Sequence, residues 1–298
     1  MEKYLLTCDT AVDLNNEYLT TRNIPFVGFH YTLDDKEYND DLGKSLSYEE
    51  FYKKIDAGSM PITSQINIAQ GIEFFEPLLK EGYDILHLAF SSGLSGTYNS
   101  MRNAAEELKE TYPDRKILVV DSLAASSGHG LLLDALYELK EKGATMEELA
   151  AFAESEKLHV QHWFYTTDLT HFKRGGRISA TACAIGNFLN LCPLMNVDYE
   201  GKLAVKYKIK GKKKAAKEAA SKMLEFCDDG KEYSKRCFIS NSGCPDDAKY
   251  LADIITEMFP NIDGGVKIYD IGTIIGTHTG RGTVALFFFG KERKEDDK

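Results

Sequence analysis

Hydroxyl and glycine residues are concentrated in residues 91–97, which read SSGLSGT and precede a predicted helix. Glycine lets a ligand approach the backbone closely, and the first turn of a helix has free N–H groups at its positive end. The hydroxyls of Ser92, Ser95 and Thr97 could add hydrogen-bond donors. This composition predicts a site for an anionic group. Helix capping by Ser95 or Thr97 is the alternative, and it explains one hydroxyl rather than four in seven positions.

Two further polar segments could join this site. Thr63 and Ser64 follow Pro61 in a segment that we expect to be a loop entering a helix, although Thr63 could simply cap that helix. Residues 276–282 read GTHTGRG, and we expect a polar loop before the last strand. His278 in this loop can donate to an anion, but a lone loop histidine also fits a structural role.

Ser95 also permits a catalytic interpretation. Residues 93–96 begin like the GxSxG turn of α/β hydrolases, but Thr97 occupies the fifth position. A hydrolase also needs a base and an orienting carboxylate, and His278 and Asp121 are candidates only on paper. The chain has no Walker lysine motif and no complete triad signature. A phosphate-handling enzyme or a hydrolase that uses the 91–97 turn stays open as the alternative function.

The six cysteines and seven histidines show no metal-binding pattern. No two cysteines stand at CxxC spacing, and no histidines form HxxxH or HExxH pairs. The cysteines are scattered along a chain that has no apparent secretion signal, so we expect reduced thiols. The sequence therefore predicts no metal site and no cofactor.

Short apolar runs predict strands that end where these polar residues begin. We expect strands at 4–7, 84–90 and 116–120, with helices over 98–110 and 130–140. Strands alternating with helices predict a parallel, Rossmann-like sheet in which ligands bind beyond the carboxyl ends of the strands. Ser91 and Asp121 stand at two of these ends.

The chain changes character near residue 158. The later segments predict strands at 160–166, 237–240, 266–271 and 284–289, a hairpin over 195–207, and helices over 179–191, 213–226 and 246–258. This pattern predicts a mixed α/β domain. We therefore expect an α/β domain over 1–158, a second α/β domain over 159–290, and a frayed charged tail over 291–298.

Composition limits the class of protein. The chain has 298 residues, 43% of them hydrophobic and 28% charged, which is typical of globular proteins rather than disordered ones. Its net charge of −10 argues against general nucleic-acid binding, which needs an excess of lysine and arginine. The amino terminus has an apolar run of only two residues before polar ones appear, so we expect no signal-peptide core, and no apolar run in the chain approaches the length of a membrane span. We expect a cytoplasmic protein without a transmembrane segment.

A basic segment interrupts this acidic chain. Residues 202–222 carry nine lysines and one acid, Glu218, so this segment is +8 and the rest of the −10 chain is −18. Most such charges simply cover a solvated helix face. A local reversal of charge also fits docking to an acidic partner, where complementarity raises the association rate. The basic residues Lys173, Arg174 and Arg177 could join it in space.

Seven motifs together resemble one known family. They are CDTAVDL at 8–14, TSQ at 63–65, SSGLSGTY at 91–98, the strand end at 121–122, KRGGRIS at 173–179, NLCPLMNVDYEGKL at 190–203 and GTHTGRG at 276–282. In this order they resemble the DegV family of fatty-acid-binding proteins, the lipid-carrying subunits of bacterial fatty acid kinases. The motifs cover nearly the whole chain.

The resemblance implies how a ligand would be held. It implies two domains with a long-chain fatty acid in a tunnel between them and the carboxylate where the domains meet. By motif, the gripping hydroxyls correspond to Thr63 and Ser95, and the further members of the network to Ser64, Ser92 and His278. In this interpretation Ser95 donates a hydrogen bond to the carboxylate and is not a nucleophile.

The resemblance also implies a partner. The carrier would have no catalytic centre of its own and would present the carboxylate to a kinase that makes acyl phosphate from ATP, and a transient contact with a membrane surface is compatible with such a role. The residues implied in kinase docking are Arg174, Arg177, Lys208 and Lys210. Where the family usually has an arginine after the hairpin, this chain has lysines, which keep the charge and lose the bidentate geometry.

Overall fold

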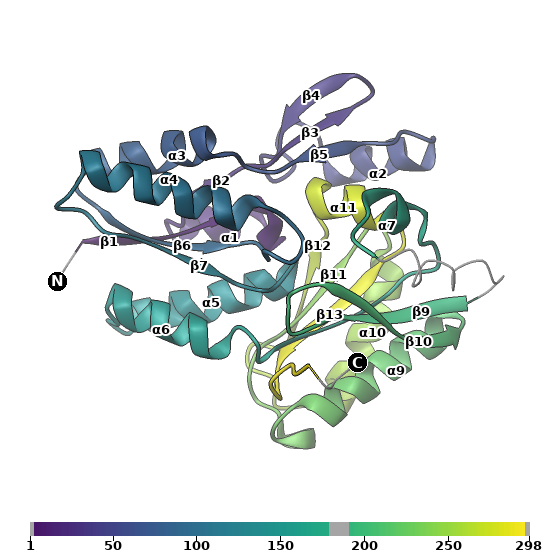
Figure 1. Ribbon diagram of the computed structural model, residues 1–298. Helices are drawn as coiled ribbons and strands as arrows, with labels where there is room; N and C mark the ends of the chain where they lie inside the picture. The colour runs from purple at the N-terminus through teal and green to yellow at the C-terminus, as the bar shows by residue number, and fades with distance from the viewer. Residues whose placement is uncertain (1–2, 179–190, 296–298) are drawn as a thin grey trace.

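A parallel sheet of four strands forms the first part of the molecule. The computed structural model describes residues 3–178 and 191–295. The strand order is β2 (Phe26–Val27), β1 (Tyr4–Asp9), β6 (Asp84–Ala89) and β7 (Ile117–Asp121), and all neighbours are parallel. Helices α3 (Ile68–Lys80) and α4 (Thr97–Thr111) lie over one face, and α5 (Ser127–Glu141) and α6 (Met146–Glu156) lie over the other (Figure 1). The predicted Rossmann-like sheet is confirmed.

A small antiparallel sheet lies beside it, with the order β4 (Lys36–Asn39), β3 (His30–Leu33), β5 (Ile62–Ser64). Helix α2 (Tyr48–Asp56) packs with this sheet in one hydrophobic cluster. The 3-10 turn η1 (Thr10–Val12) and helix α1 (Asn16–Thr21) follow β1 and contact α5 instead. The loop predicted around Thr63 and Ser64 is wrong, because both residues pair with β3 in strand β5. Thr63 does not cap the following helix either, since the N-cap of α3 is Asn67.

The third sheet has six strands and is mixed. Its order is β10 (Leu203–Lys210), β9 (Leu191–Val197), β8 (Val160–Tyr165), β13 (Val284–Phe289), β11 (Cys237–Asn241) and β12 (Val266–Asp270), and only β11 and β12 are parallel. Helices α9 (Lys212–Phe226) and α10 (Pro245–Met258) pack on it, with a 3-10 turn η3 (Gly230–Glu232). The predicted hairpin is β9–β10, and the mixed α/β class of this part is confirmed.

Two short helices, α7 (Thr170–Gly175) and α11 (Thr273–Thr279), pack together where the small sheet meets the six-stranded sheet (Figure 1). The prediction of a loop over 276–282 is therefore wrong for its first four residues. Gly276 is needed in α11, because a Cβ there would lie 2.5 Å from the Tyr52 hydroxyl oxygen. This close packing against α2 compensates for the weak helix propensity of glycine and threonine.

Two predictions fall at the limits of the described residues. The helix predicted over 179–191 lies outside them except for Leu191, which begins β9. The prediction of a frayed tail over 291–298 is wrong for Arg293, whose side chain is 3% exposed and hydrogen-bonded. A domain boundary near residue 158 stays a prediction. No helix in the described ranges is long and apolar enough to cross a membrane.

Candidate ligand-binding site

A cavity lies between the two parts of the chain, with about 790 Å³ of empty space that is partly open to solvent. Most of the cavity wall is apolar, and residues before 126 and residues after 162 both contribute to it. The apolar lining includes Phe29, Phe90, Leu94, Phe164, Phe172, Val197, Leu203, Ile274 and Phe287. Its polar lining includes Thr63, Ser64, Gln65, Ser95, Arg177 and His278. Ser126, His162, Thr279 and Thr283 also line it. The cavity therefore suits a mostly apolar molecule that carries a polar group.

Thr63 and His278 meet at this cavity from different elements. Strand β5 carries Thr63 and the last turn of α11 carries His278, and Thr63 Oγ1 lies 2.8 Å from His278 Nε2. The imidazole packs tightly against α7, since a Cβ on Gly175 would lie 2.2 Å from His278 Nδ1. Burial, reinforced by the charge of Arg177, lowers the pKa of His278 to about 4. The imidazole is therefore neutral at pH 7.

Ser95 lies in the turn before α4 and is linked to the Thr63 segment through Thr97. The Ser95 hydroxyl oxygen accepts a bond from the Thr97 N–H at 3.2 Å and lies 3.0 Å from Thr97 Oγ1. Thr97 Oγ1 in turn accepts from the N–H of Ile66 at 3.2 Å. The formal N-cap of α4 is Gly96, which makes no side-chain cap bond. The two hydroxyl motifs are thus joined by hydrogen bonds, and we call Thr63, Ser95, Thr97 and His278 the hydroxyl cluster.

The other predicted site residues occupy different places. Ser64 lines the cavity, whereas Ser92 is exposed, lies outside the lining, and donates its backbone N–H to Asp121. Arg177 lines the cavity and donates to the carbonyls of Leu94 and Gly175. Arg174 donates to the carbonyl of Met60. The remaining predicted docking residues, Lys208 and Lys210, are exposed on the edge strand β10 and do not line the cavity.

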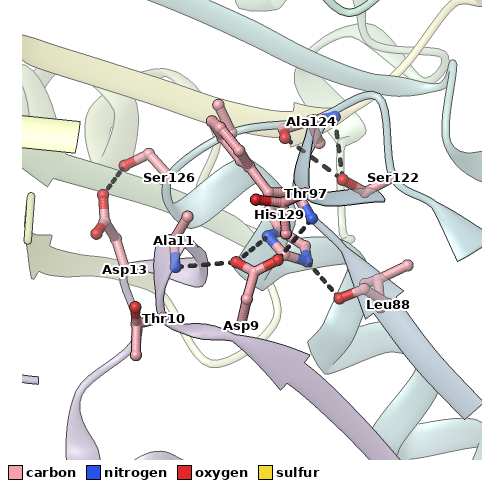
Figure 2. Close-up of polar contacts among 12 residues, drawn as sticks. Asp9, Thr10, Ala11, Asp13, Leu88, Thr97, Ser122, Ala124, Ser126 and His129 are labelled. Atoms are coloured by element: carbon pink, nitrogen blue, oxygen red, sulfur yellow. Dashed lines mark hydrogen bonds and ion pairs between the residues drawn. The ribbon is translucent and has the colours of Figure 1, made fainter. Parts of the chain in front are cut away.

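A second polar group lies at the carboxyl end of β1, and Figure 2 shows it. Asp9 accepts from the N–H groups of Ala11 at 3.0 Å and Phe90 at 2.7 Å. Asp13 accepts from the Ser126 hydroxyl at 2.5 Å and from the N–H of Gly272 at 2.9 Å. We call Asp9, Asp13, Ser126 and His129 the aspartate cluster.

Burial governs ionisation in the aspartate cluster. It raises the pKa of Asp9 to about 7 against the effect of the two N–H donors, and raises the pKa of Asp13 well above its usual range. Burial also lowers the pKa of His129 to about 4, and its Nε2 donates to the carbonyl of Leu88 at 3.1 Å. The hydrogen bonds of Asp9, Asp13 and His129 join the ends of β1 and β6 to α5 and to the start of α11.

The contacts of the 91–97 turn do not favour the hydrolase or phosphate-handling alternative. A Cβ on Gly93 would lie 2.4 Å from the carbonyl of Glu200, so this glycine serves to pack the β9–β10 hairpin. Ser95 bonds to Thr97, and His278 bonds to Thr63. Asp121 accepts from the N–H groups of Ser92 and Leu123. The three residues of the hypothetical triad are therefore engaged separately.

Some lining residues could not be identified from the sequence. Gln65 belongs to the TSQ motif, and its side chain lies so close to Gly96 that a Cβ there would be 2.3 Å from Oε1. The aromatic lining comes from strands and helices far apart in the chain, and its residues have the same pattern as ordinary core. Among the residues that the structure describes, no group of three or more His, Cys, Asp or Glu side chains could hold a metal ion.

Comparison with known proteins identifies relatives along the whole chain. A family model described as "DegV family COG1307" matches residues 3–291. A DegV domain-containing protein of Clostridium perfringens is 40% identical over 294 residues, which is 99% of this chain and all of that protein.

Two solved structures share the fold. A DegV family protein from Thermus thermophilus, described by its fatty acid binding, has a TM-score of 0.85 and 27% identity over 97% of this chain and all of that one. A fatty acid binding DegV family protein from Streptococcus agalactiae has a TM-score of 0.83 and 27% identity over 98% of this chain and all of that one.

Proposed function

The chain belongs to the DegV family, and from this premise we propose that it binds one long-chain fatty acid, with the acyl chain in the apolar cavity and the carboxylate on the hydroxyl cluster. The observation that carries the proposal is the cavity wall, whose surface is mostly apolar and whose polar residues include Thr63, Ser95 and His278. The fatty acid binding described for two structural relatives supports it.

The hydroxyl cluster has hydrogens available for a carboxylate. With its proton on Nε2, neutral His278 donates to Thr63 Oγ1, which leaves the Thr63 hydroxyl hydrogen free. With the Thr97 hydroxyl donating to Ser95 Oγ, the Ser95 hydrogen is also free. A buried carboxylate needs such donors, because an unpaired anion is costly away from water and bonds to an ionised acceptor are strong.

Charge and apolar burial would add to the affinity. Arg177 lines the cavity and its charge acts on His278, so the local potential attracts an anion. Each buried methylene contributes about 0.8 kcal/mol, so a chain of a dozen or more methylenes supplies the larger share.

We further propose that the protein is a carrier that presents its ligand to a kinase for acyl-phosphate formation. Ser95, His278 and Asp121 each hydrogen-bond to a different partner and not to one another, which supports a binding role rather than catalysis. The exposed basic residues Lys208 and Lys210 on an edge strand, with Arg174 and Arg177 near the hydroxyl cluster, support docking to an acidic partner surface.

Lipid analysis tests the binding proposal. The purified chain should release about one fatty acid per protein on solvent extraction, measured by mass spectrometry. After delipidation it should bind hexadecanoate in a calorimetric titration. A chain that emerges empty and gives no binding signal would show the proposed function to be wrong.

A further inference from the structure

Arg293 is a buried cation in a segment of otherwise exposed charged residues. Its side chain is 3% exposed, whereas Lys291, Glu292, Lys294 and Glu295 are exposed. Its guanidinium donates to four backbone carbonyls: those of Val197 at 3.4 Å, Asp198 at 2.7 Å, Leu123 at 2.9 Å and Lys157 at 2.8 Å. One side chain therefore joins the β9–β10 turn, the loop after β7 and the loop before β8.

An arginine is required for this arrangement. The guanidinium has five N–H donors in a fixed plane, whereas an ammonium has three and cannot reach four carbonyls spread over three loops. Within the described residues no ion pair joins Arg293 to a carboxylate, although the charges of Asp198 and Asp121 act on it. Burial lowers the pKa of Arg293 to about 10, so it stays charged at pH 7.

The turn that Arg293 holds is closed by its own hydrogen bonds. Asp198 accepts from the N–H groups of Glu200 and Lys202 at 2.9 Å each, and the N–H of Asp198 donates to the carbonyl of Lys202 at 2.8 Å. Gly201 has a φ of +74°, which favours glycine, and donates to the carbonyl of Asp198 at 3.1 Å. A displacement of Asp198 would therefore move the whole turn.

This turn contacts the segment that carries Ser95. The Ser91 hydroxyl donates to the carbonyl of Gly201 at 2.8 Å, and the Ser91 carbonyl accepts the N–H of Ser95 at 3.1 Å. The fit leaves no spare room, since a Cβ on Gly201 would lie 2.2 Å from Ser91 Oγ. Leu123, whose carbonyl Arg293 also binds, packs on the same glycine.

We propose that Arg293 is a positioning residue for the carboxylate site: by fixing residues 198–202 against Ser91, it sets where Ser95 lies in the hydroxyl cluster. The proposal rests on the proposed function for its effect on affinity, but not for its effect on the backbone. A contiguous series of hydrogen bonds, from Arg293 through the turn to Ser91 and Ser95, transmits the effect of Arg293 on the position of Ser95.

The test compares Arg293→Met with Lys291→Met, a matched loss of a cation two residues away at an exposed position. Amide hydrogen exchange is followed at Gly201 and Ser95, and hexadecanoate affinity is measured by titration under conditions where all variants are folded. Arg293→Met should speed exchange at both amides at least tenfold and weaken binding at least tenfold. Lys291→Met should change neither by more than twofold.

A double-mutant cycle separates positioning from general destabilisation. The cycle uses Ser91→Ala and Arg293→Lys, because lysine keeps the charge and more readily preserves folding. Each single variant should weaken hexadecanoate binding. The fold-loss of affinity in the double variant should be smaller than the product of the two single fold-losses. Additive effects, or unchanged exchange at Ser95 in folded Arg293→Met, would overturn the proposal. If the wild type does not bind hexadecanoate, the proposed function is wrong, and the exchange rates alone decide the role of Arg293.

Discussion

The hydroxyl cluster and the aspartate cluster both gather polar side chains near the carboxyl ends of the parallel strands, but they differ in what remains unpaired. In the aspartate cluster, Asp9 accepts two backbone N–H groups, and Asp13 accepts one N–H and one hydroxyl. In the hydroxyl cluster, Thr63 and Ser95 have hydrogens that the described contacts do not require. Apart from His129 Nδ1, which has no hydrogen-bond partner among the described residues, the aspartate cluster is paired and fixes the backbone, whereas spare donors in the hydroxyl cluster are available to a ligand.

This difference separates stability from binding. The aspartate cluster ties β1 to α5 and to Gly272, the N-cap of α11, so its loss should loosen the frame that carries His278. Loss of a hydroxyl in the hydroxyl cluster should leave this frame intact and lower the affinity for a carboxylate. The predictions below test this division, beginning with the largest expected effect.

Asp13→Ala should lower the free energy of unfolding by about 2 kcal/mol, because it leaves the buried N–H of Gly272 without an acceptor and leaves the Ser126 hydroxyl only Ser240 Oγ, at 3.0 Å, as a partner. Urea unfolding measures the change. Glu37→Ala, an exposed acid on β4, is the control and should stay within about 0.5 kcal/mol of wild type. If Asp13→Ala is as stable as Glu37→Ala, the aspartate cluster does not hold the frame.

Ser95→Ala should weaken fatty acid binding about thirtyfold, or about 2 kcal/mol, because it removes a donor to an ionised group. Ser92→Ala is the matched control three residues earlier. Ser92 lies outside the cavity, so this variant should bind as the wild type does. Calorimetric titration compares the two. Equal losses in both variants would contradict the assignment of Ser95.

His278 should make stability depend on pH. Its pKa falls from 6.5 in the unfolded chain to about 4 in the folded one, so its contribution is present above pH 6.5 and is lost as the pH falls towards 4. Between pH 7 and 5 the wild type should lose about 1 kcal/mol more than His278→Gln, allowing for partial exposure. Urea unfolding at several pH values measures this, and parallel curves would mean that His278 is not held neutral by burial.

Arg177→Gln should have the smallest effect, about a threefold loss of affinity at low salt, because Arg177 attracts the carboxylate mainly through its charge. The loss should shrink in 0.5 M salt, since mobile ions screen a partly exposed charge. Titrations at two salt concentrations measure it. A loss that does not respond to salt would indicate direct bonding instead.

The sequence predicted those elements whose apolar pattern is continuous. Strands β6 and β13 are buried along their whole length, and helix α4 has a regular apolar face, so periodicity alone identified them. Strands β3 to β5 are only three or four residues long and partly exposed, and they form through pairing with one another. No local pattern indicated that Thr63 would lie in a strand.

The site was predicted by residue type better than by position. Glycines in α11 suggested a loop, because the packing of Gly276 against Tyr52 cannot be read from neighbouring residues. Arg293 resembled any charged terminal residue, since its partners are backbone carbonyls from three distant segments. Spacing along the chain does not indicate which polar residues will find buried partners in the fold.

The central claim is that the hydroxyl cluster holds a carboxylate while the cavity holds its acyl chain. The most direct measurement is a parallel titration of the delipidated wild type and Thr63→Val with hexadecanoate and with its methyl ester, which has the same chain and no charge. We expect the wild type to bind the acid at least tenfold more tightly than the ester, and Thr63→Val to lose most of that preference. Equal affinity of the wild type for acid and ester, or the same preference in both proteins, would contradict the account.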